Sequence, residues 1–370
     1  MEEVNYNCFI CDNPIEGDNV TVEHIILNGI GGKLRSKNLI CKKCNNELGS
    51  GSDVALSESL SFYTDMLLVK KDRDNDHNQV MIDEDGHEII VEKAGNKLIL
   101  RRPYFHKEVK GNEKRYHIVV KNEEELRRYL AGQVKVGEMT QEQMDELLSK
   151  AKVKKQRPRL NKQTCVPEEA FPSIVKSAVE YYIECFHQND NIKHLIPYLK
   201  GEKDCKDVLN LVILNQLPYA ENPNEITHMI HLEGSAKNGA LYALMEYYSL
   251  YTYVVFLKDN YTGPDVNVTY CYDVIKNLEV KRDFSLPVDR NWIAEYKSSF
   301  ESRSKELFAK IEKRAEKILG IWQEKEIEKM VSGVVNKAFG KYPEGCMITP
   351  EIFKQLLKDI TDGLEDYLVG

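Results

Sequence analysis

The chain has 370 residues, of which 42% are hydrophobic and 30% charged, and its formal net charge is −8 at pH 7. This length allows two or three domains with a sizeable core, whereas the negative charge excludes a protein that coats duplex DNA with a basic surface. Any nucleic-acid binding then requires local basic patches, or an assembly that concentrates them. The acidic N-terminus and the lack of a long apolar run predict a cytoplasmic protein with neither signal peptide nor membrane span.

Residues 1–50 are rich in cysteine, asparagine and glycine and lack a long periodic apolar stretch. A small domain of this composition rarely folds on its core alone, so we expect a metal ion to stabilise it. Two Cys-x-x-Cys pairs, Cys8 with Cys11 and Cys41 with Cys44, are typical of one tetrahedral zinc site. A closed site of four thiolates is structural, because it leaves no open position for a substrate.

Between the two cysteine pairs, the sequence predicts two short strands followed by a helix. The first strand lies within residues 21–26 and carries an acid and a histidine, Glu23 and His24. The helix begins at the second cysteine pair. The intervening loop contains three glycines, which permit positive φ and close backbone approach: Gly29, Gly31 and Gly32.

A longer helix is predicted from Asp53, because apolar residues recur there at spacings of four, three and four. The polar residues 72–78 that follow mark the expected domain boundary. The sequence therefore predicts a first domain at residues 1–75 and a second at residues 76–370.

The second domain is predicted to open with short strands separated by turns, at residues 80–82, 88–91, 97–100 and 116–120. Two helices follow, one near Asn122 and one at Thr140, because each position starts a capping-box spacing. Residues 150–162 hold seven Lys or Arg in thirteen positions, which indicates a solvated linker or, alternatively, a strap that contacts phosphates.

The rest of the chain is predicted to be helical at residues 167–200, to contain strands within residues 226–275, and to be helical from about residue 289. The dense tyrosines of the strand region are interpreted as core packing in preference to a base-stacking platform. The predicted fold class is α+β, with a small zinc-stabilised module followed by a larger mixed α/β domain that has a helical C-terminus.

The order of these residues resembles the HNH endonuclease family, whose fold is the ββα-metal motif. The closest match is the subgroup that writes its motif as EHI…GG…NLxCxxCN inside a four-cysteine frame, as residues 23–45 do here. The resemblance is dense over residues 8–53, little more than a tenth of the chain. It implies an enzyme that hydrolyses phosphodiester bonds in DNA.

Phosphodiester hydrolysis needs a base that deprotonates water and a cation that offsets the charge on the phosphate. Imidazole suits the first task because it titrates near neutral pH, and hard oxygen ligands suit Mg²⁺ or Mn²⁺. The resemblance implies that His24 is the general base and that Asn38 orients it. It also implies that Glu23 and Asn45 hold the divalent ion. Taken singly, His24 could be a satisfied, partly buried histidine, Asn45 a helix cap and Asn38 a turn residue.

Three departures from the family pattern bear on these roles. Leu27 stands where many members have proline, which affects only the turn. The last ligand is asparagine instead of histidine, which favours Mg²⁺ or Mn²⁺ over a tightly held catalytic zinc. Asn45 lies only seven positions after Asn38, so the neighbouring Asn46 is an alternative ligand.

A cluster of basic residues surrounds the glycine loop and could face the phosphates of DNA, although scattered lysines on a solvated turn fit equally well. The cluster comprises Lys33, Arg35, Lys37, Lys42 and Lys43.

Hydrolysis of a phosphodiester bond does not require the residues beyond position 75, so we expect residues 76–370 to serve targeting, sensing or assembly. HNH modules fused to large domains resemble effectors of prokaryotic anti-phage defence or nucleases of mobile elements. In such effectors a signal ligand or a partner protein releases the nuclease, so we expect residues 76–370 to bind a signal ligand or a regulatory protein, or to form a homo-oligomer. Two other classes stay open. One is a zinc-stabilised nucleic-acid-binding module without catalysis, and the other is a scaffold in which the N-terminal module only docks.

Overall fold

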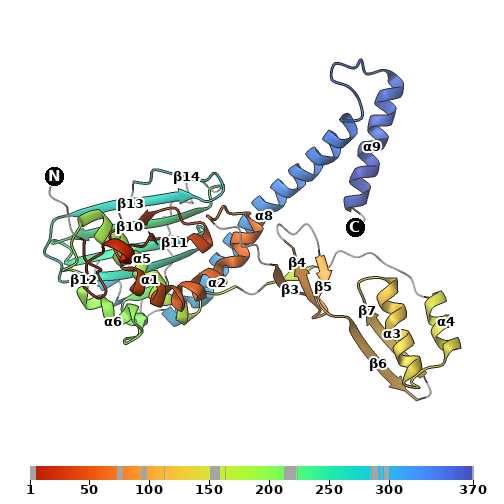
Figure 1. Ribbon diagram of the computed structural model, residues 1–370, viewed down its shortest axis with the longest axis horizontal. Helices are drawn as coiled ribbons and strands as arrows, with labels where there is room; N and C mark the ends of the chain where they lie inside the picture. The colour runs from red at the N-terminus through yellow and green to blue at the C-terminus, as the bar shows by residue number, and fades with distance from the viewer. Residues whose placement is uncertain are drawn as a thin grey trace. The chain divides into compact units, whose positions relative to one another are not determined.

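The computed structural model describes residues 6–72, 78–92, 98–111, 113–150, 159–162, 164–211, 222, 224–283, 285, 291–292, 294–295 and 300–368 (Figure 1). The chain divides into two compact units, one of residues 1–76 with 164–322 and one of residues 77–163 with 323–370. The sequence analysis expected a different division, into residues 1–75 and 76–370. The two divisions differ because the N-terminal segment packs on a later helix and sheet instead of forming a separate domain. No described helix is both long and apolar enough to cross a membrane.

The centre of the first unit is a six-stranded antiparallel sheet in the order β14-β13-β10-β11-β12-β9. Every residue of β11 is buried, as expected for a strand covered on both faces. The tyrosines of this region (242, 247, 248, 251 and 253) are at most 5% exposed, which confirms the packing interpretation. The strands are β9 (Leu209–Leu211), β10 (Thr227–Ser235), β11 (Ala240–Tyr247), β12 (Tyr251–Asp259), β13 (Val266–Asp273) and β14 (Leu278–Glu279).

Helix α5 (Phe171–Phe186) lies across this sheet and contacts β10, β11 and β12 (Figure 1). Its buried face includes two charged residues one turn apart, Lys176 and Glu180. The predicted helical region around it is confirmed, and it also contains η4 (Glu168–Ala170), η5 (Lys193–Leu195) and α6 (Ile196–Leu199), with η6 (Cys205–Asp207) following.

The N-terminal segment packs onto α5 and has the predicted order of two short strands and a helix. β1 (Glu23–His24) pairs antiparallel with β2 (Arg35–Ser36), and α1 (Lys42–Gly49) begins at the second cysteine pair. The helix predicted from Asp53 is α2 (Ser52–Met66), which contacts both α1 and α5. Two short 3-10 turns complete the segment, η1 (Gly17–Asn19) and η2 (Asn28–Ile30).

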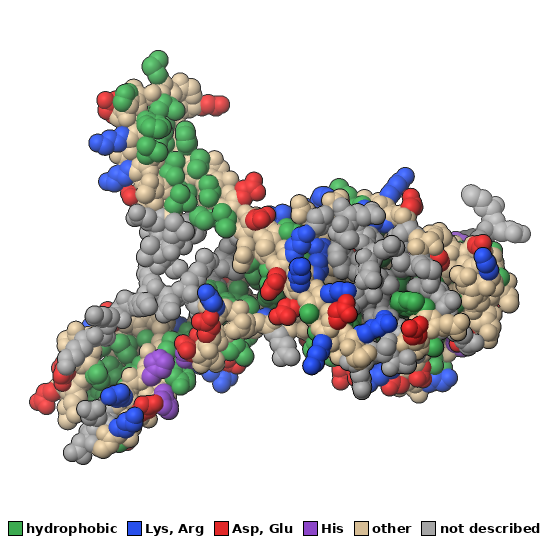
Figure 2. All heavy atoms as spheres, turned by 180° about the vertical axis from the view of Figure 1, so that it is seen from behind, with side chains coloured by type: hydrophobic (Ala, Val, Ile, Leu, Met, Phe, Trp, Pro, Cys, Tyr) green, Lys and Arg blue, Asp and Glu red, His purple; other side chains and the backbone are tan. Residues whose placement is uncertain are grey.

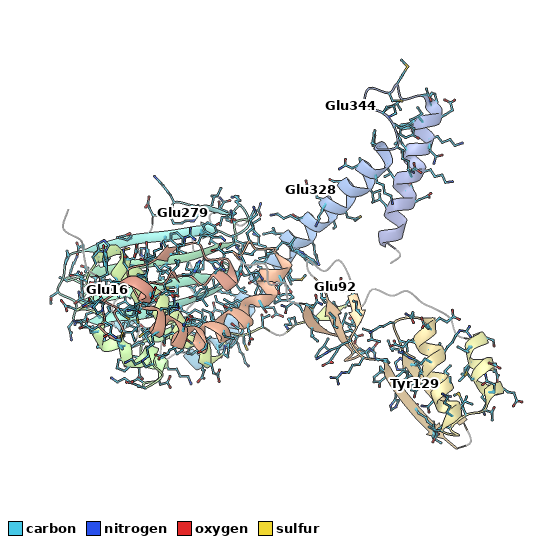
Figure 3. All side chains as sticks on the ribbon, in the orientation of Figure 1. Glu16, Glu92, Tyr129, Glu279, Glu328 and Glu344 are labelled. Carbon is cyan, nitrogen blue, oxygen red and sulfur yellow. The ribbon has the colours of Figure 1, made fainter. Side chains whose placement is uncertain are left out.

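The second unit contains the predicted strands and capped helices. A four-stranded antiparallel sheet has the order β5-β4-β3-β8, and β6 pairs with β7 as a hairpin. Tyr129 of α3, which is labelled in Figure 3, stacks on Phe105 of β6. The elements are β3 (Gln79–Asp83), β4 (Glu88–Val91), β5 (Leu98–Leu100), β6 (Tyr104–Lys110), β7 (Glu113–Val119), α3 (Glu123–Lys135), α4 (Gln141–Lys150) and β8 (Leu160–Asn161).

At both predicted capping boxes, the first side chain accepts the expected hydrogen bond from the backbone amide three positions later. The Asn122 side chain accepts from the Glu125 amide at 2.9 Å, and the Thr140 hydroxyl accepts from the Gln143 amide at 3.2 Å. Most of the basic segment, residues 151–158, lies outside the described residues.

The C-terminal region is helical, as predicted, with α8 (Phe300–Phe339) and α9 (Pro350–Leu368). The first part of α8 belongs to the first unit. There Arg314 donates to the backbone oxygens of Ser249 and Glu225 at 3.2 and 2.9 Å. The mixed α/β class with a helical C-terminus is therefore confirmed.

Candidate metal centre and active site

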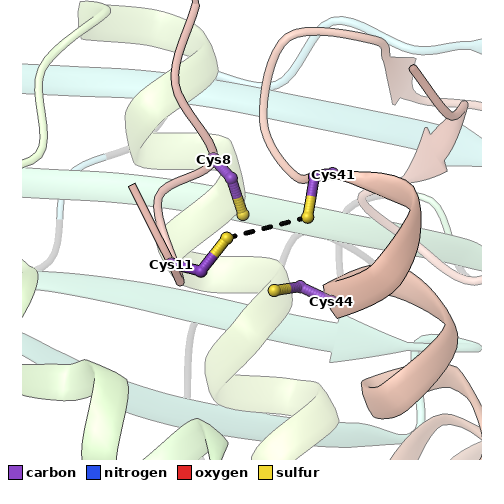
Figure 4. Close-up of side chains that lie close together, drawn as sticks. All are labelled: Cys8, Cys11, Cys41 and Cys44. Atoms are coloured by element: carbon purple, nitrogen blue, oxygen red, sulfur yellow. Dashed lines mark hydrogen bonds between the residues drawn. The ribbon is translucent and has the colours of Figure 1, made fainter. Parts of the chain in front are cut away.

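The two cysteine pairs form one cluster at the start of α1. The four sulfur atoms of Cys8, Cys11, Cys41 and Cys44 all lie within 4.8 Å of one another, and those of Cys11 and Cys41 are 3.7 Å apart (Figure 4). A tetrahedral zinc ion with Zn–S bonds of about 2.3 Å needs sulfur atoms about 3.8 Å apart. The donor set and its spacing therefore fit a structural zinc site.

Local backbone geometry brings these thiols together. The first pair sits in a tight turn, in which the amide of Asp12 donates to the Cys8 oxygen at 2.8 Å, and Asp12 itself has φ of 62°. The second pair spans the N-terminus of α1, where Cys41 is the N-cap. Burial raises the pKa of the Cys8 and Cys44 thiols, so deprotonation there depends on a bound cation.

Neighbouring residues of a strand point to opposite faces, and β1 shows this clearly. Glu23 is 4% exposed, whereas the His24 side chain is 22% exposed. Glu23 therefore faces the interior and α5, while His24 reaches solvent.

His24 lies beside a carboxylate that no sequence motif indicates. Its Nε2 is 3.2 Å from Oδ2 of Asp72, whose Oδ1 accepts from Lys33 at 3.0 Å. The Asp72 amide donates to the Asn28 side chain at 2.9 Å, which ties the carboxylate to the glycine loop. Lys33 and then His24 lower the pKa of Asp72, so this carboxylate is charged at neutral pH and can orient the imidazole.

Glu23 belongs to a buried cluster of charges, which we call the Lys176 cluster and define as Glu23, Asp53, Lys176 and Glu180. The Lys176 ammonium donates to Oε1 of Glu23 at 2.8 Å and to Oδ2 of Asp53 at 2.6 Å. Burial alone would lower the pKa of Lys176, but the three carboxyl groups outweigh it and raise that pKa, so the ammonium is charged. Burial raises the pKa of Glu180, the fourth member of the cluster, well above its usual value.

The other two proposed site residues are bonded to residues other than His24 and Glu23. Asn38 is exposed, and its backbone amide donates to the Ser36 hydroxyl at 3.2 Å. Asn45 lies inside α1 and its side-chain nitrogen donates to the Thr21 hydroxyl at 3.4 Å. Among the described residues no hydrogen bond joins Asn38 to His24 or Asn45 to Glu23, so their proposed roles stay predictions.

The basic cluster is mostly solvated. Arg35, Lys37, Lys42 and Lys43 are exposed, and Arg35 is paired with His24 across the two-stranded ribbon. Lys33 is the exception because it is half-buried and paired with Asp72. Positive charge therefore lies on the same ribbon as His24.

The glycine loop is fixed to the six-stranded sheet. The Ile30 oxygen accepts from Nε2 of His228 at 2.8 Å and from the Tyr248 hydroxyl at 2.9 Å. The Tyr248 amide donates to Nδ1 of His228 at 3.3 Å, so the ring is neutral, with its proton on Nε2. Burial agrees with this assignment, since it lowers the pKa of His228 to about 4.

The sequence analysis did not predict roles for Lys176, Asp72 or His228. Of these three residues, only Lys176 lies in a sequence pattern that indicates its role. A lysine and a glutamate one turn apart interrupt the apolar face of residues 171–182, and buried charges of this kind need partners. Asp72 and His228 carry no comparable signal, because each acquires its role from a contact distant in the chain.

The comparisons with known proteins agree with this geometry for one segment. Residues 8–61 match the family model described as HNH endonuclease. The searches of curated proteins and of solved structures gave no match. The match spans both cysteine pairs, β1, β2, α1 and most of α2. It confirms the resemblance, so residues 8–61 of this chain are similar to the HNH endonuclease family.

Proposed function

We propose that the chain is a metal-dependent endonuclease that hydrolyses phosphodiester bonds in DNA. The observation that carries this proposal is the coincidence of the family match with an assembled ββα element, in which His24 reaches solvent next to a charged carboxylate. In this mechanism His24 is the general base that accepts the proton of the attacking water. Asp72 holds the imidazole in place and stabilises its protonated form.

A divalent ion, Mg²⁺ or Mn²⁺, would supply the charge that offsets the phosphate in the transition state. The donor chemistry fits such an ion, since Glu23 offers a carboxylate and Asn45 a carbonyl oxygen. The Asn45 nitrogen is bonded to Thr21, so its oxygen is the atom left to serve as a ligand. Asn38 would help to orient His24, and Arg35, Lys37, Lys42 and Lys43 would contact the DNA backbone together with Lys33.

The test is cleavage of supercoiled plasmid by the zinc-loaded full chain with Mg²⁺ or Mn²⁺. We expect His24→Ala to lower the cleavage rate by about 10²- to 10⁴-fold, the usual contribution of a general base. Folding should be unaffected, because the substitution removes only a partly exposed contact with Asp72. His106→Ala, which changes an exposed histidine in β6, is the matched control and should cut like the wild type.

Three results would count against the mechanism. Equal cutting by wild type and His24→Ala would place the chemistry elsewhere. Cutting that persists in EDTA would exclude the divalent ion. Tight DNA binding by a wild type that never cuts would favour the non-catalytic alternative, a zinc-stabilised nucleic-acid-binding module.

The biological role that we propose is an effector of prokaryotic anti-phage defence that assembles before it cuts. The net charge of −8 supports a requirement for assembly, because an isolated acidic chain binds DNA weakly. Apolar side chains are exposed along the α8–α9 region (Figure 2), and a second copy of the chain would cover them. They are Ile327, Val331, Phe339, Met347, Ile348, Phe353 and Leu357.

This assembly is tested by light scattering on the wild type and on a Phe353→Glu/Leu357→Glu variant. We expect the wild type to self-associate and the variant to be monomeric. A wild-type monomer that cuts DNA without any partner would rule the idea out.

A further inference from the structure

Lys176 connects the nuclease module to the rest of its unit. It lies in α5, 115 positions beyond the last residue of the family match, and is 1% exposed. Its ammonium nevertheless reaches a carboxylate of β1, because it donates to Oε1 of Glu23 at 2.8 Å. A residue outside the module therefore determines where a proposed metal ligand sits.

Only one of the two oxygens of Glu23 is engaged in this way. Among the described residues, Oε1 accepts from Lys176 and Oε2 has no hydrogen-bond partner. A carboxylate with one oxygen anchored and the other not hydrogen-bonded is the arrangement that outer groups impose on metal ligands.

Lys176 is itself held in place on its other side. It donates to Oδ2 of Asp53 at 2.6 Å, and the Ser173 hydroxyl donates to Oδ1 of the same carboxylate at 2.6 Å. The side chains of Ser173, Asp53, Lys176 and Glu23 thus form an unbroken chain of bonds from α5 and α2 to β1. Since Asp53 offsets the charge of Lys176, the pair adds no net positive charge that would repel a cation at Glu23.

Stability alone is a weak explanation for this arrangement. Burying an ion pair contributes little, because desolvation cancels most of the attraction, and apolar side chains of similar size often do as well. The bonds instead hold Glu23 in one rotamer, whereas a long carboxylate side chain without such bonds samples several rotamers.

We propose that Lys176 is a positioning residue that anchors Oε1 of Glu23 so that Oε2 is presented to the divalent ion. This inference rests on the proposed function, in which Glu23 is a ligand of that ion. It means that the nuclease module binds its catalytic metal well only while it is docked on α5. The sheet domain is then part of the active enzyme, in addition to any role in sensing or assembly.

The test is a Mn²⁺ titration of the zinc-loaded full chain, in which electron paramagnetic resonance measures free Mn²⁺ without any need for cleavage. Lys176→Met alone would leave buried carboxylates uncompensated and so destabilise the module, and the main variant is therefore Lys176→Met/Asp53→Asn. It removes one positive and one negative charge and so keeps the net charge of the Lys176 cluster. Zinc content and circular dichroism verify the fold of each variant.

We expect the double variant to bind Mn²⁺ about 10- to 100-fold more weakly, as removal of an outer group typically does. Asp53→Asn alone keeps the bond between Lys176 and Glu23 and should lose less affinity than the double variant. Lys193→Met changes an exposed lysine just beyond α5 and should bind Mn²⁺ like the wild type.

Glu23→Gln separates this inference from the proposed function. If Glu23→Gln leaves Mn²⁺ affinity unchanged, Glu23 is not a ligand, and both the metal site and the role of Lys176 are overturned. If Glu23→Gln weakens binding but the double variant does not, the metal site stands and only the positioning role fails. A double variant that binds Mn²⁺ more tightly also overturns the positioning role, because Lys176 would then compete with the metal.

Discussion

The cysteine cluster and the strand β1 lie in the same small module, yet they are held in place by different parts of the chain. Cys11 and Cys41, whose sulfur atoms lie 3.7 Å apart, are separated by 30 positions in the chain, and the two cysteine pairs sit on a local turn and at the start of α1. Glu23 is held by Lys176, which is 153 positions away, and the neighbouring glycine loop is held by His228 and Tyr248. The metal centre can therefore form from local structure, whereas the proposed active site needs the docked sheet domain.

The largest expected effect comes from removing the cysteine site. Cys44→Ser leaves three thiolates, and structural zinc sites of this kind bind their ion with about 10–16 kcal/mol. We expect residues 6–50 to exchange their amide hydrogens rapidly, while residues 227–273 stay protected by their own buried sheet. Hydrogen exchange measured by mass spectrometry reports both regions at once.

Cys346→Ser is the control, because this cysteine lies outside the cluster and should change neither zinc content nor exchange. If the sheet loses protection together with the N-terminal residues, the two regions fold as one cooperative unit. The contrast between a local metal centre and a dependent active site would then fail.

A smaller effect is expected at the glycine loop, where module and sheet meet. A Cβ on Gly32 would lie 1.9 Å from the Ile26 backbone oxygen, so Gly32→Ala forces the backbone to move. A Cβ on Gly29 would meet the Ser57 hydroxyl at 2.7 Å, and that side chain can rotate away. We expect Gly32→Ala to lower the free energy of unfolding by about 3 kcal/mol and Gly29→Ala by about 1 kcal/mol.

Denaturant titration of the two glycine variants measures this difference. Equal losses would show that the loop adapts to an added methyl group at either position. The close approach of Gly32 to the Ile26 backbone would then not determine the loss of stability.

The smallest effect is a dependence on pH that arises at the docking contact. His228 is buried and neutral with a pKa of about 4, whereas an unfolded histidine titrates near about 6.5. Between these values the unfolded chain binds a proton that the folded chain excludes. The free energy of unfolding should therefore fall as the pH is lowered, by about 2 kcal/mol between pH 8 and pH 5.

His228→Gln sharpens this measurement, because glutamine still offers a donor to Ile30 and an acceptor to the Tyr248 amide but does not titrate. Its stability should fall less steeply than that of the wild type over the same pH range. The buried Glu246, whose pKa burial raises to about 7, acts in the opposite direction but is common to both proteins. Identical slopes would show that His228 is accessible to protons in the folded state.

Much of the local structure was predictable because it depends on neighbouring residues. The Cys-x-x-Cys spacings, the two strands before α1, the helix from Asp53 and the caps at Asn122 and Thr140 all follow from turn and helix chemistry. Gly31, for example, has φ of 90°, as its place in a glycine loop led us to expect.

The amino-acid sequence by itself thus determined the zinc frame, the order of two strands and a helix, and the candidates Glu23 and His24. Only the tertiary structure decided that His24 meets Asp72, that Glu23 meets Lys176 and that Ile30 meets His228. The physical reason is that spacing along the chain encodes bonds within a turn or a helix. An ion pair or hydrogen bond between distant residues exists only after packing has removed water and brought the two groups together.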